Sequence, residues 1–390
     1  MQRAPARPGD PLAAVETPAL CVDLEAFERN LDRMAHATRG IRLRPHAKSH
    51  KTPEIARAQI ARGAIGVCCQ KTDEAAAFVE AGIRDVLVTN EVVGPAKVRR
   101  LADLARHATI GVLIDAPAVV PLLAQTARAA GVLLDAYVEI DVGAHRCGVA
   151  PGVPAAELAG AIAAAPGLRF KGVQAYHGPA QHLRTPAERN AAVEAAAAHV
   201  RATRAALAQA RIACDIVTGA GTGTWPLEQH SGVYDELQPG SYVFMDADYA
   251  RNTHAANDVR FEHSLFVLAA VMSAPAPDRI IVDAGLKAFS FDSGLPLVVA
   301  VGGIPAAIAP APVSPAPPVH RRDGLEYRKA TDEHGIITIA PGARAPALDD
   351  RVWLVPGHCD PTVNLYDWLV AYRGARVEAV WQVAARGALG

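Results

Sequence analysis

Polar side chains that could do chemistry gather in a short segment near the start of the chain, LRPHAKSH at residues 43–50. Read as a strand, the segment places Arg44, His46, Lys48 and His50 on one face, because alternate residues of a strand point the same way. A lysine is seldom buried without a partner. An inward Lys48 could be a nucleophilic amine, since buried or cationic surroundings lower the pKa of a lysine. The spacing also fits an exposed lysine at a strand end, with histidines that pack or lie in a solvated loop.

Two later segments combine glycines with hydroxyl groups, TGAGTGT at 218–224 and QPGSY at 238–242. Glycine lets backbone N–H groups approach an anion, and nearby hydroxyls add hydrogen bonds, so both segments suit a phosphate. They could instead form only tight turns. A phosphate site together with an inward lysine indicates pyridoxal phosphate, which is anchored by a lysine and takes up electrons during catalysis.

A third segment, VPGHCDPTVNLYDW at 355–368, contains possible metal ligands. If HCD is extended, His358 and Asp360 share one face and Cys359 points away. An imidazole and a carboxylate suit Mn²⁺ or Mg²⁺ with water completing the shell, whereas Zn²⁺ more readily takes the thiolate. A polar loop would explain the same residues.

The elements that must position these residues follow a regular rhythm after residue 40. Short apolar runs alternate with amphipathic stretches that often begin at Pro or Thr and end at Gly, as helices do. We expect strands at 41–48, 65–70, 85–90, 109–115, 133–141, 168–178, 214–221 and 236–243. About eight such units in roughly 200 residues predict an α/β fold of the (β/α)₈ barrel type. A doubly wound open sheet is the rival and would need fewer units.

In a barrel of this type the functional side chains lie at the carboxyl ends of the strands. The expected strand ends carry a ring of polar and titratable residues: Lys48, Gln70, Lys71, Asn90, Glu139, Asp141, Arg146, Gln174, Tyr176 and His177. We expect the barrel to span residues 26–255. A mainly β domain at 256–390, to which residues 1–25 would also belong, is expected to carry the metal pair. The Pro- and Ala-rich segment 303–324 predicts an exposed loop or insertion.

Composition narrows the possible functions further. The chain has 390 residues, of which 51% are hydrophobic, and a formal net charge of -1. That balance is ordinary for a globular protein and offers no basic surface for nucleic acid or an anionic membrane. No apolar stretch approaches about 18 residues, and residues 1–18 do not resemble a signal peptide. Six cysteines without C-x-x-C pairs favour the reducing cytoplasm.

The chain resembles the D-threonine aldolase family of pyridoxal-phosphate enzymes, whose barrel is of the alanine-racemase type. The family also includes 3-hydroxy-D-aspartate aldolase and, more distantly, metal-dependent D-serine dehydratase. The matching segments run in order through nearly the whole chain: TPALCVDLEAFERNL, RPHAKSHKTPEIA, GVCCQKTDEA, NEVVGPAK, DVGAHRCGV, QAYHG, TGAGTGT, SGVYDELQPGSYVFMDADY, VDAGLKA, DEHG and PGHCDPTVNLYDW.

Carried over by position, the resemblance implies that Lys48 is the Schiff-base lysine and that His182 is the catalytic base. Three residues correspond to contacts with the cofactor ring, namely Gln70, Arg146 and Tyr176. Phosphate contacts correspond to Thr222, Gly240, Ser241 and Tyr242, and a further cofactor contact corresponds to Tyr249. His358 and Asp360 match the metal pair. Asp332 in DEHG is a residue that would orient neighbouring groups.

The resemblance implies an aldolase that cleaves a β-hydroxy-D-amino acid to glycine and an aldehyde, and it implies a homodimer. One alternative is a D-serine dehydratase that releases pyruvate and ammonia. The dehydratases typically have cysteine as the second metal ligand, two residues after the histidine, so Asp360 favours the aldolase. The other alternative is a non-catalytic protein that only binds pyridoxal phosphate, but such proteins usually consist of the barrel alone.

Overall fold

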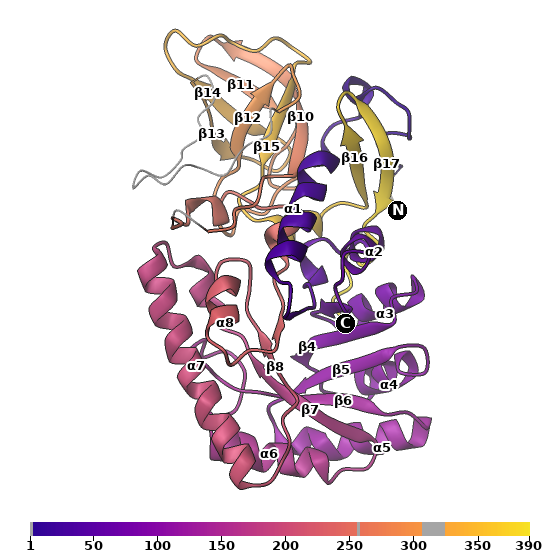
Figure 1. Cartoon of the computed structure of the whole chain (residues 1–390). Coiled ribbons are helices and arrows are strands. Elements are labelled where there is room, and N and C mark those ends of the chain that lie inside the picture. The colour runs from indigo at the N-terminus through magenta and orange to yellow at the C-terminus, as the bar shows by residue number, and fades with distance from the viewer. Residues whose placement is uncertain (1–2, 256–257, 306–323) are drawn as a thin grey trace. The chain divides into compact units, whose positions relative to one another are not determined.

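The computed structural model describes residues 3–255, 258–305 and 324–390, which form two compact units (Figure 1). The barrel unit comprises Ala35–Lys48, Pro53–Gly240 and Ala388–Gly390. The β unit comprises the described residues of Met1–Met34, Ser49–Thr52 and Ser241–Gly387. The long segment of the barrel unit therefore ends at Gly240, ahead of the predicted boundary at residue 255.

The barrel unit is built on a parallel sheet with eight strands in the described chain. Their order is β2 (Arg42–Leu43), β9 (Glu236–Leu237), β8 (Ile216–Gly219), β7 (Leu168–Ala175), β6 (Leu134–Glu139), β5 (Thr109–Ile114), β4 (Asp85–Glu91) and β3 (Val67–Cys69). A parallel bridge between His46 and Cys68 joins the segment after β2 to β3. The first and last strands of the order are thereby connected. Each predicted strand overlaps one of these strands, and the predicted barrel class is confirmed.

Helices on the outside of the sheet alternate with the strands (Figure 1). They are α2 (Pro53–Ile60), α3 (Thr72–Glu80), α4 (Pro95–Leu104), α5 (Val120–Ala130), α6 (Val153–Ala163), α7 (Pro186–Gln209) and α8 (Trp225–His230). The start of α7 shows how the sequence sets a boundary. Thr185 accepts a hydrogen bond from the backbone of Glu188, Glu188 accepts one from Thr185 in return, and Pro186 occupies the first turn.

The segment LRPHAKSH is not the single strand that alternation predicted. Strand β2 ends at Leu43, and Ala47–Ser49 form a short 3₁₀ helix, η2. Arg44 is buried and forms ion pairs with Glu236, at 3.0 Å, and with Asp85, at 2.5 Å. The charge of Arg44 is thus satisfied within the barrel, and the four polar residues do not share one face.

The β unit contains a second sheet, whose strands follow one path and a branch. The path is β13 (Leu325–Ala330), β14 (Gly335–Ile339), β11 (Arg279–Val282), β10 (Leu265–Ala276), β1 (Ala19–Asp23), β16 (Trp368–Arg373) and β17 (Arg376–Gln382). On the branch, β15 (Arg351–Val355) pairs with both β10 and β12 (Leu297–Val301). The rings of Phe266, Trp353 and Tyr372 pack in its core, with centroids 5.9 and 5.4 Å apart.

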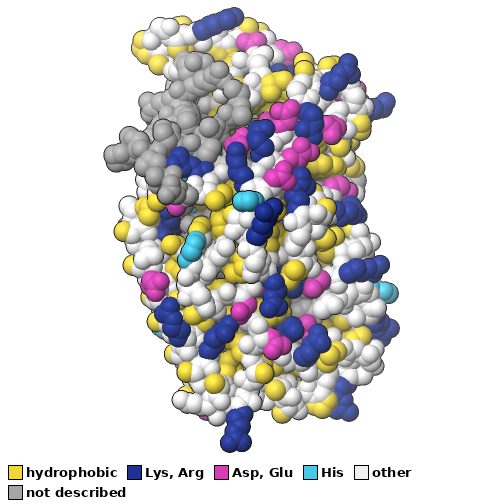
Figure 2. Space-filling view, in the orientation of Figure 1, with side chains coloured by type: hydrophobic (Ala, Val, Ile, Leu, Met, Phe, Trp, Pro, Cys, Tyr) yellow, Lys and Arg dark blue, Asp and Glu magenta, His cyan; other side chains and the backbone are white. Residues whose placement is uncertain are grey.

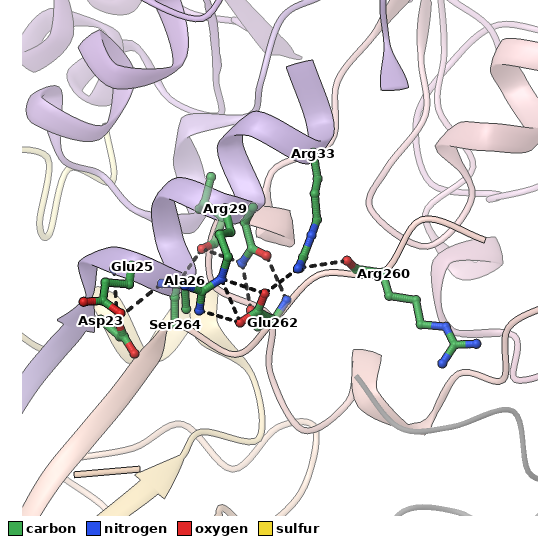
Figure 3. A network of polar contacts seen from close by, with 10 residues as sticks. Asp23, Glu25, Ala26, Arg29, Arg33, Arg260, Glu262 and Ser264 are labelled. Atoms are coloured by element: carbon green, nitrogen blue, oxygen red, sulfur yellow. Dashed lines mark hydrogen bonds and ion pairs between the residues drawn. The ribbon is translucent and has the colours of Figure 1, made fainter. Parts of the chain in front are cut away.

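Helix α1 (Leu24–Ala37) is tied to the segment before β10 by a polar network (Figure 3). The side chain of Glu262 is nearly buried and accepts hydrogen bonds from Arg29. The Glu262 carboxylate also pairs with Arg33 at 2.6 Å. The backbone N–H of Glu262 donates a hydrogen bond to Asn30 Oδ1 at 2.8 Å. Burial alone would raise the pKa of Glu262, but the two arginines lower it, so the buried carboxylate stays charged.

The surface carries both signs of charge, as the visible face shows (Figure 2). No helix in the described ranges has the length and hydropathy needed to cross a bilayer. Most of the predicted insertion at 303–324 lies outside the described residues, which stop at 305 and resume at 324.

Candidate active site

The strand ends of the barrel unit bring most of the predicted residues to one edge of the sheet. Gln70 follows β3, Tyr176 follows β7, Thr222 follows β8 and Gly240 follows β9. Arg146 lies in the loop after β6. Because the strands are parallel, their carboxyl ends meet at the same end of the barrel, where function is expected.

Lys48 lies in η2 at the end of the first strand segment and is half-buried. Its charge is one of those that act on the thiol of Cys68, a buried residue of β3. Burial is the main influence on that thiol and raises its pKa, whereas Arg44 and Lys48 act to lower it. Lys48 is thus near enough to β3 for its charge to act on the pKa of a buried thiol there.

His46 holds the backbone that carries Lys48. Its Nδ1 lies 3.3 Å from the backbone nitrogen of Lys48, and its Nε2 lies 2.9 Å from the Thr89 hydroxyl and 3.2 Å from Gln70 Oε1. Gln70 Nε2 in turn donates to the Thr89 carbonyl. His46 therefore connects the predicted anchor lysine to the predicted ring contact Gln70, a positioning role that spacing did not reveal.

The glycine-rich loop after β8 is packed tightly against Gln181. A Cβ added at Gly221 would lie 2.5 Å from Gln181 Oε1, and one added at Gly223 would lie 2.5 Å from the Gln181 carbonyl oxygen. Gln181 Oε1 accepts from the backbone N–H of Gly223 at 2.9 Å, and Gln181 Nε2 donates to Thr224 Oγ1 at 2.7 Å. These glycines are therefore required by close approach, and the buried Gln181 fixes the loop.

Thr222 in this loop has a side-chain hydroxyl that a ligand could bind. Its side-chain oxygen is buried and has no hydrogen-bond partner among the residues that the structure describes. Burial of a hydroxyl without a hydrogen-bond partner costs the folded protein about 1–3 kcal/mol of stability, unless a bound ligand forms the missing hydrogen bond. A phosphate oxygen at this loop would do so, and the loop residues thus fit the phosphate of the predicted cofactor.

Arg146 and Tyr176 form a second contact at the strand ends. The guanidinium carbon of Arg146 lies 5.8 Å from the centroid of the Tyr176 ring, a cation–π arrangement. Arg146 also approaches the carboxylate of Glu139 at 3.7 Å. Burial, followed by the hydrogen bond with Glu91, raises the pKa of Glu139 well above its ordinary range. The folded protein therefore favours the protonated form of Glu139.

A separate trio of possible metal ligands lies nearby, which the sequence did not suggest. The ligand atoms of Glu91, Asp115 and Cys147 all lie within 4.8 Å of one another. Burial, with Glu91 next, raises the pKa of Cys147 to about 11, so its thiol is protonated near neutral pH. The trio is therefore a candidate cation site in which the thiol would have to lose its proton.

The predicted base, His182, ends the 3₁₀ helix η4 (Pro179–His182) and is exposed. It directly follows Gln181, the residue that fixes the glycine-rich loop. His177 lies nearby in sequence and is half-buried, and burial lowers its pKa. His182 is thus the more accessible imidazole for proton transfer at this end of the barrel unit.

The remaining predicted cofactor contacts belong to the β unit. Ser241 and Tyr242 form η5 (Ser241–Val243), and Tyr249 begins η6 (Tyr249–Arg251). Ser241 Oγ donates a 3.4 Å hydrogen bond to Asp360 Oδ1. The structure therefore brings a predicted phosphate contact together with a predicted metal ligand.

Asp246 connects this segment to the predicted metal pair. Its fully buried carboxylate accepts one hydrogen bond from the backbone N–H of Tyr249 and another from that of Cys359, both at 3.0 Å. Burial is the main influence on the pKa of Asp246 and raises it. Sequence reasoning missed this role, because Asp246 and Cys359 are far apart in the chain.

The HCD segment is not extended as predicted. His358 has extended backbone angles and caps α9 (Cys359–Val363), so Asp360 lies in the first turn of that short helix. Cys359 is completely buried, but its thiol does not point away from the pair as expected, because Sγ lies 3.3 Å from Asp360 Oδ1. Burial raises the pKa of Cys359 well above its ordinary value and keeps the thiol protonated.

The surroundings of His358 suit a cation. Burial would lower its pKa, but the charge of Asp360 and the hydrogen bond with Asp292 outweigh this effect and raise it. His358 thus binds a proton more firmly than an ordinary histidine, and a divalent ion can take the place of that proton. One imidazole and a carboxylate with hard oxygens fit Mn²⁺ or Mg²⁺ better than Zn²⁺. Asp332, the remaining predicted residue, is exposed in the β unit.

Two family models match the chain. Residues 22–248 match the model described as alanine racemase, N-terminal domain. Residues 264–372 match the model described as putative serine dehydratase domain. The two matches correspond broadly to the barrel and to the second sheet.

Relatives of known activity are similar over almost the whole chain. A D-threonine aldolase from Arthrobacter sp. is 48% identical over 98% of this chain and 96% of its own length. A 3-hydroxy-D-aspartate aldolase from Paracoccus denitrificans is 44% identical over 98% of this chain and 95% of its own. The crystal structure of D-threonine aldolase from Filomicrobium marinum has a TM-score of 0.92 and 46% identity, covering 99% of this chain and 100% of that one.

Proposed function

This chain belongs to the family of D-threonine and 3-hydroxy-D-aspartate aldolases, and from that premise we propose that it cleaves a β-hydroxy-D-amino acid to glycine and an aldehyde. The observation that carries the proposal is the braced glycine-rich loop with the unsatisfied Thr222 hydroxyl, in the same barrel unit as Lys48. This combination suits a lysine-anchored cofactor with a phosphate.

The residues of this chain fit pyridoxal phosphate. Lys48 would hold it covalently, and its phosphate would be bound by Thr222, Gly240, Ser241 and Tyr242. Gln70, Arg146, Tyr176 and Tyr249 would contact the rest of the cofactor. When bound, pyridoxal phosphate supplies an electron sink for the bond that breaks. The protein contributes the orientation of that bond, through the contacts that fix Lys48 and the loop.

His182 would act as the base in the reaction. The β-hydroxyl proton of the substrate passes to the His182 imidazole, directly or through water, as the Cα–Cβ bond breaks. The single bond between Cβ and the hydroxyl oxygen becomes the C=O double bond of the aldehyde. Cα keeps the bonding pair and takes up a proton to become glycine, so atoms and charges balance.

His358 and Asp360 would hold a divalent cation, Mn²⁺ or Mg²⁺. Such an ion would supply Lewis acidity near the β-hydroxyl. The carboxylates around His358 support this assignment over the trio of Glu91, Asp115 and Cys147, whose thiol is protonated near neutral pH.

A D-serine dehydratase remains the alternative function. A D-threo-3-hydroxyaspartate dehydratase from Delftia sp. is 31% identical, a lower similarity than either aldolase shows. Solved structures named D-threo-3-hydroxyaspartate dehydratase include one in which a histidine is replaced by alanine and one in which a cysteine two positions later is replaced by alanine. In this chain Asp360 stands two positions after His358, and the aspartate favours the aldolase. A non-catalytic pyridoxal-phosphate protein would not need the carboxylates that surround His358.

We also propose a homodimer in the cytoplasm. The dimer is inferred from the family resemblance alone, and light scattering would test it. The cytoplasmic location is supported by six cysteines, all within the described residues, that form no disulfide. The net charge of -1 gives no support for a nucleic-acid or membrane partner, so the expected partner is the small-molecule substrate.

A product assay on the purified holoenzyme tests the proposed function. D-Threonine, D-3-hydroxyaspartate and D-serine would be offered separately, with L-threonine as the control for stereochemistry. We expect glycine with an aldehyde from at least one of the first two. Pyruvate and ammonia from D-serine, without glycine from the others, would show that the chain is a dehydratase.

A further inference from the structure

Asp292 contacts the imidazole that is assigned to the cation. His358 Nδ1 lies 2.7 Å from Asp292 Oδ2, although 66 residues separate the two in the chain. An ionised carboxylate can only accept a hydrogen bond, so Nδ1 is the donor. The proton is thereby fixed on Nδ1, and Nε2 becomes the nitrogen that can bind a cation.

The Asp292 carboxylate is itself held in place. The hydroxyl of Ser290 donates to Oδ1 at 2.7 Å, and the hydroxyl of Ser293 lies 3.0 Å from Oδ2. Its side chain is half-exposed, whereas that of His358 is mostly buried. The carboxylate that contacts the His358 ring is thus held in a defined geometry.

The loop that carries Asp292 is tied to the His358 segment at several further points. Ser290 N–H donates to Thr362 Oγ1 at 3.2 Å, and Thr362 Oγ1 donates to the His358 carbonyl at 2.8 Å. A Cβ at Gly357 would lie only 2.2 Å from the Gly294 carbonyl oxygen, so the two backbones touch. A side chain at 357 would push the loop away from His358.

We propose that Asp292 is a positioning residue for the cation site, which orients His358 and fixes its tautomer so that Nε2 faces the ion. The inference rests on the proposed cation role of His358 and Asp360. Carboxylates that accept from the second nitrogen of a ligating histidine raise its basicity, and their removal typically weakens metal binding by about 10- to 100-fold.

The test measures Mn²⁺ affinity, by the electron paramagnetic resonance signal of free Mn²⁺, on full-length holoenzyme stripped of metal. We expect Asp292→Asn to weaken binding by about tenfold and Asp292→Ala by up to about 100-fold. Asp278→Asn is the matched control, because Asp278 is an exposed carboxylate of the same unit whose side chain pairs with its neighbour Arg279. It should bind Mn²⁺ as the parent does.

A second readout separates positioning from a structural role. The nitrogen coupling of bound Mn²⁺, seen by electron spin echo, should be present in the parent protein and reduced in Asp292→Ala. Unchanged affinity and coupling in both Asp292 variants would overturn the inference, even if their denaturation midpoints fall.

The variant His358→Ala distinguishes this failure from failure of the proposed function. If His358→Ala loses Mn²⁺ while the Asp292 variants do not, only the role of Asp292 is wrong. If His358→Ala binds Mn²⁺ like the parent, the cation site itself has been misplaced, and the inference about Asp292 falls with it.

Discussion

Individual side chains in the candidate site are fixed by neighbours on other strands. His46 is held by the Thr89 hydroxyl and by Gln70, and it lies against the backbone nitrogen of Lys48. A lysine that must return to the same cofactor atom after every turnover benefits from such a support, since misplacement by about 1 Å can cost 10²-fold in rate. The assignment of the anchor to Lys48 can therefore be tested as the property of one residue.

Replacement of Lys48 by alanine should abolish covalent retention of the cofactor, because no other side chain on η2 offers an amine. We expect the visible absorbance to be lost on gel filtration and activity to fall below detection. Lys97→Ala, which removes an exposed lysine of α4, should retain both. Absorbance that survives in Lys48→Ala would assign the anchor to another of the seven lysines.

At the scale of elements, the turn from β8 into α8 combines the phosphate loop with a buried acid. Glu228 of α8 is almost completely buried and accepts a hydrogen bond from Thr224, the last residue of the glycine-rich segment. Burial raises the pKa of Glu228 to about 7. The folded state therefore favours the protonated form of this carboxyl, which has consequences for stability.

The raised pKa of Glu228 predicts that the free energy of unfolding falls as the pH rises. Between the ordinary value of 4.5 and about 7, the folded protein holds a proton on Glu228 that the unfolded chain has lost. Ionisation above pH 7 thus costs the folded state up to about 3 kcal/mol. Glu228→Gln mimics the protonated acid and removes the dependence.

The measurement compares denaturant midpoints of the two proteins at pH 5 and pH 8. We expect the parent to lose stability relative to Glu228→Gln between these values. A constant difference between the two proteins would mean that Glu228 does not titrate in this window.

The strand and helix rhythm was predictable, because hydrophobic periodicity is local and each barrel unit repeats it. The predicted conformation was wrong for segments in which tertiary contacts override the local sequence pattern. LRPHAKSH alternates like a strand, yet its sheet pairing stops after His46, where the short helix η2 begins. HCD likewise enters α9, because Asp246 accepts from the Cys359 N–H and holds the turn.

The same limit explains which site residues were missed. Lys48, Thr222, His358 and Asp360 lie in short segments whose residue types indicate their chemistry. Gln181, Asp246 and Asp292 act through partners that are distant in sequence, as with Asp292 and His358. A single sequence carries no signal for such pairs, which only the fold brings together.

At the scale of the whole molecule, a bound cation should stabilise the protein by mass action. A ligand at 100 times its Kd adds about 2.7 kcal/mol to the folded state if the unfolded chain does not bind it. We expect Mn²⁺ to raise the melting temperature of the metal-free protein and EDTA to reverse the change. His358→Ala should abolish the shift, whereas Glu91→Gln should preserve it.

The opposite pattern, in which only Glu91→Gln loses the shift, would place the cation at the trio of Glu91, Asp115 and Cys147. Activity measured in the same samples should follow the melting temperature. Full activity after EDTA, with no change in melting, would remove the cation from the proposed function.

The chain passes between its two units at five points: 34/35, 48/49, 52/53, 240/241 and 387/388. One of these passages directly follows Lys48, and another directly precedes Ser241. Neither unit is therefore one uninterrupted stretch of the gene, and no single cut yields a self-contained half for expression. A crossover between relatives at 48/49 or 240/241 would sever the chain beside the proposed anchor lysine or the proposed phosphate contact, and a crossover at any one of the five points would split a unit, so the two units are expected to be inherited together.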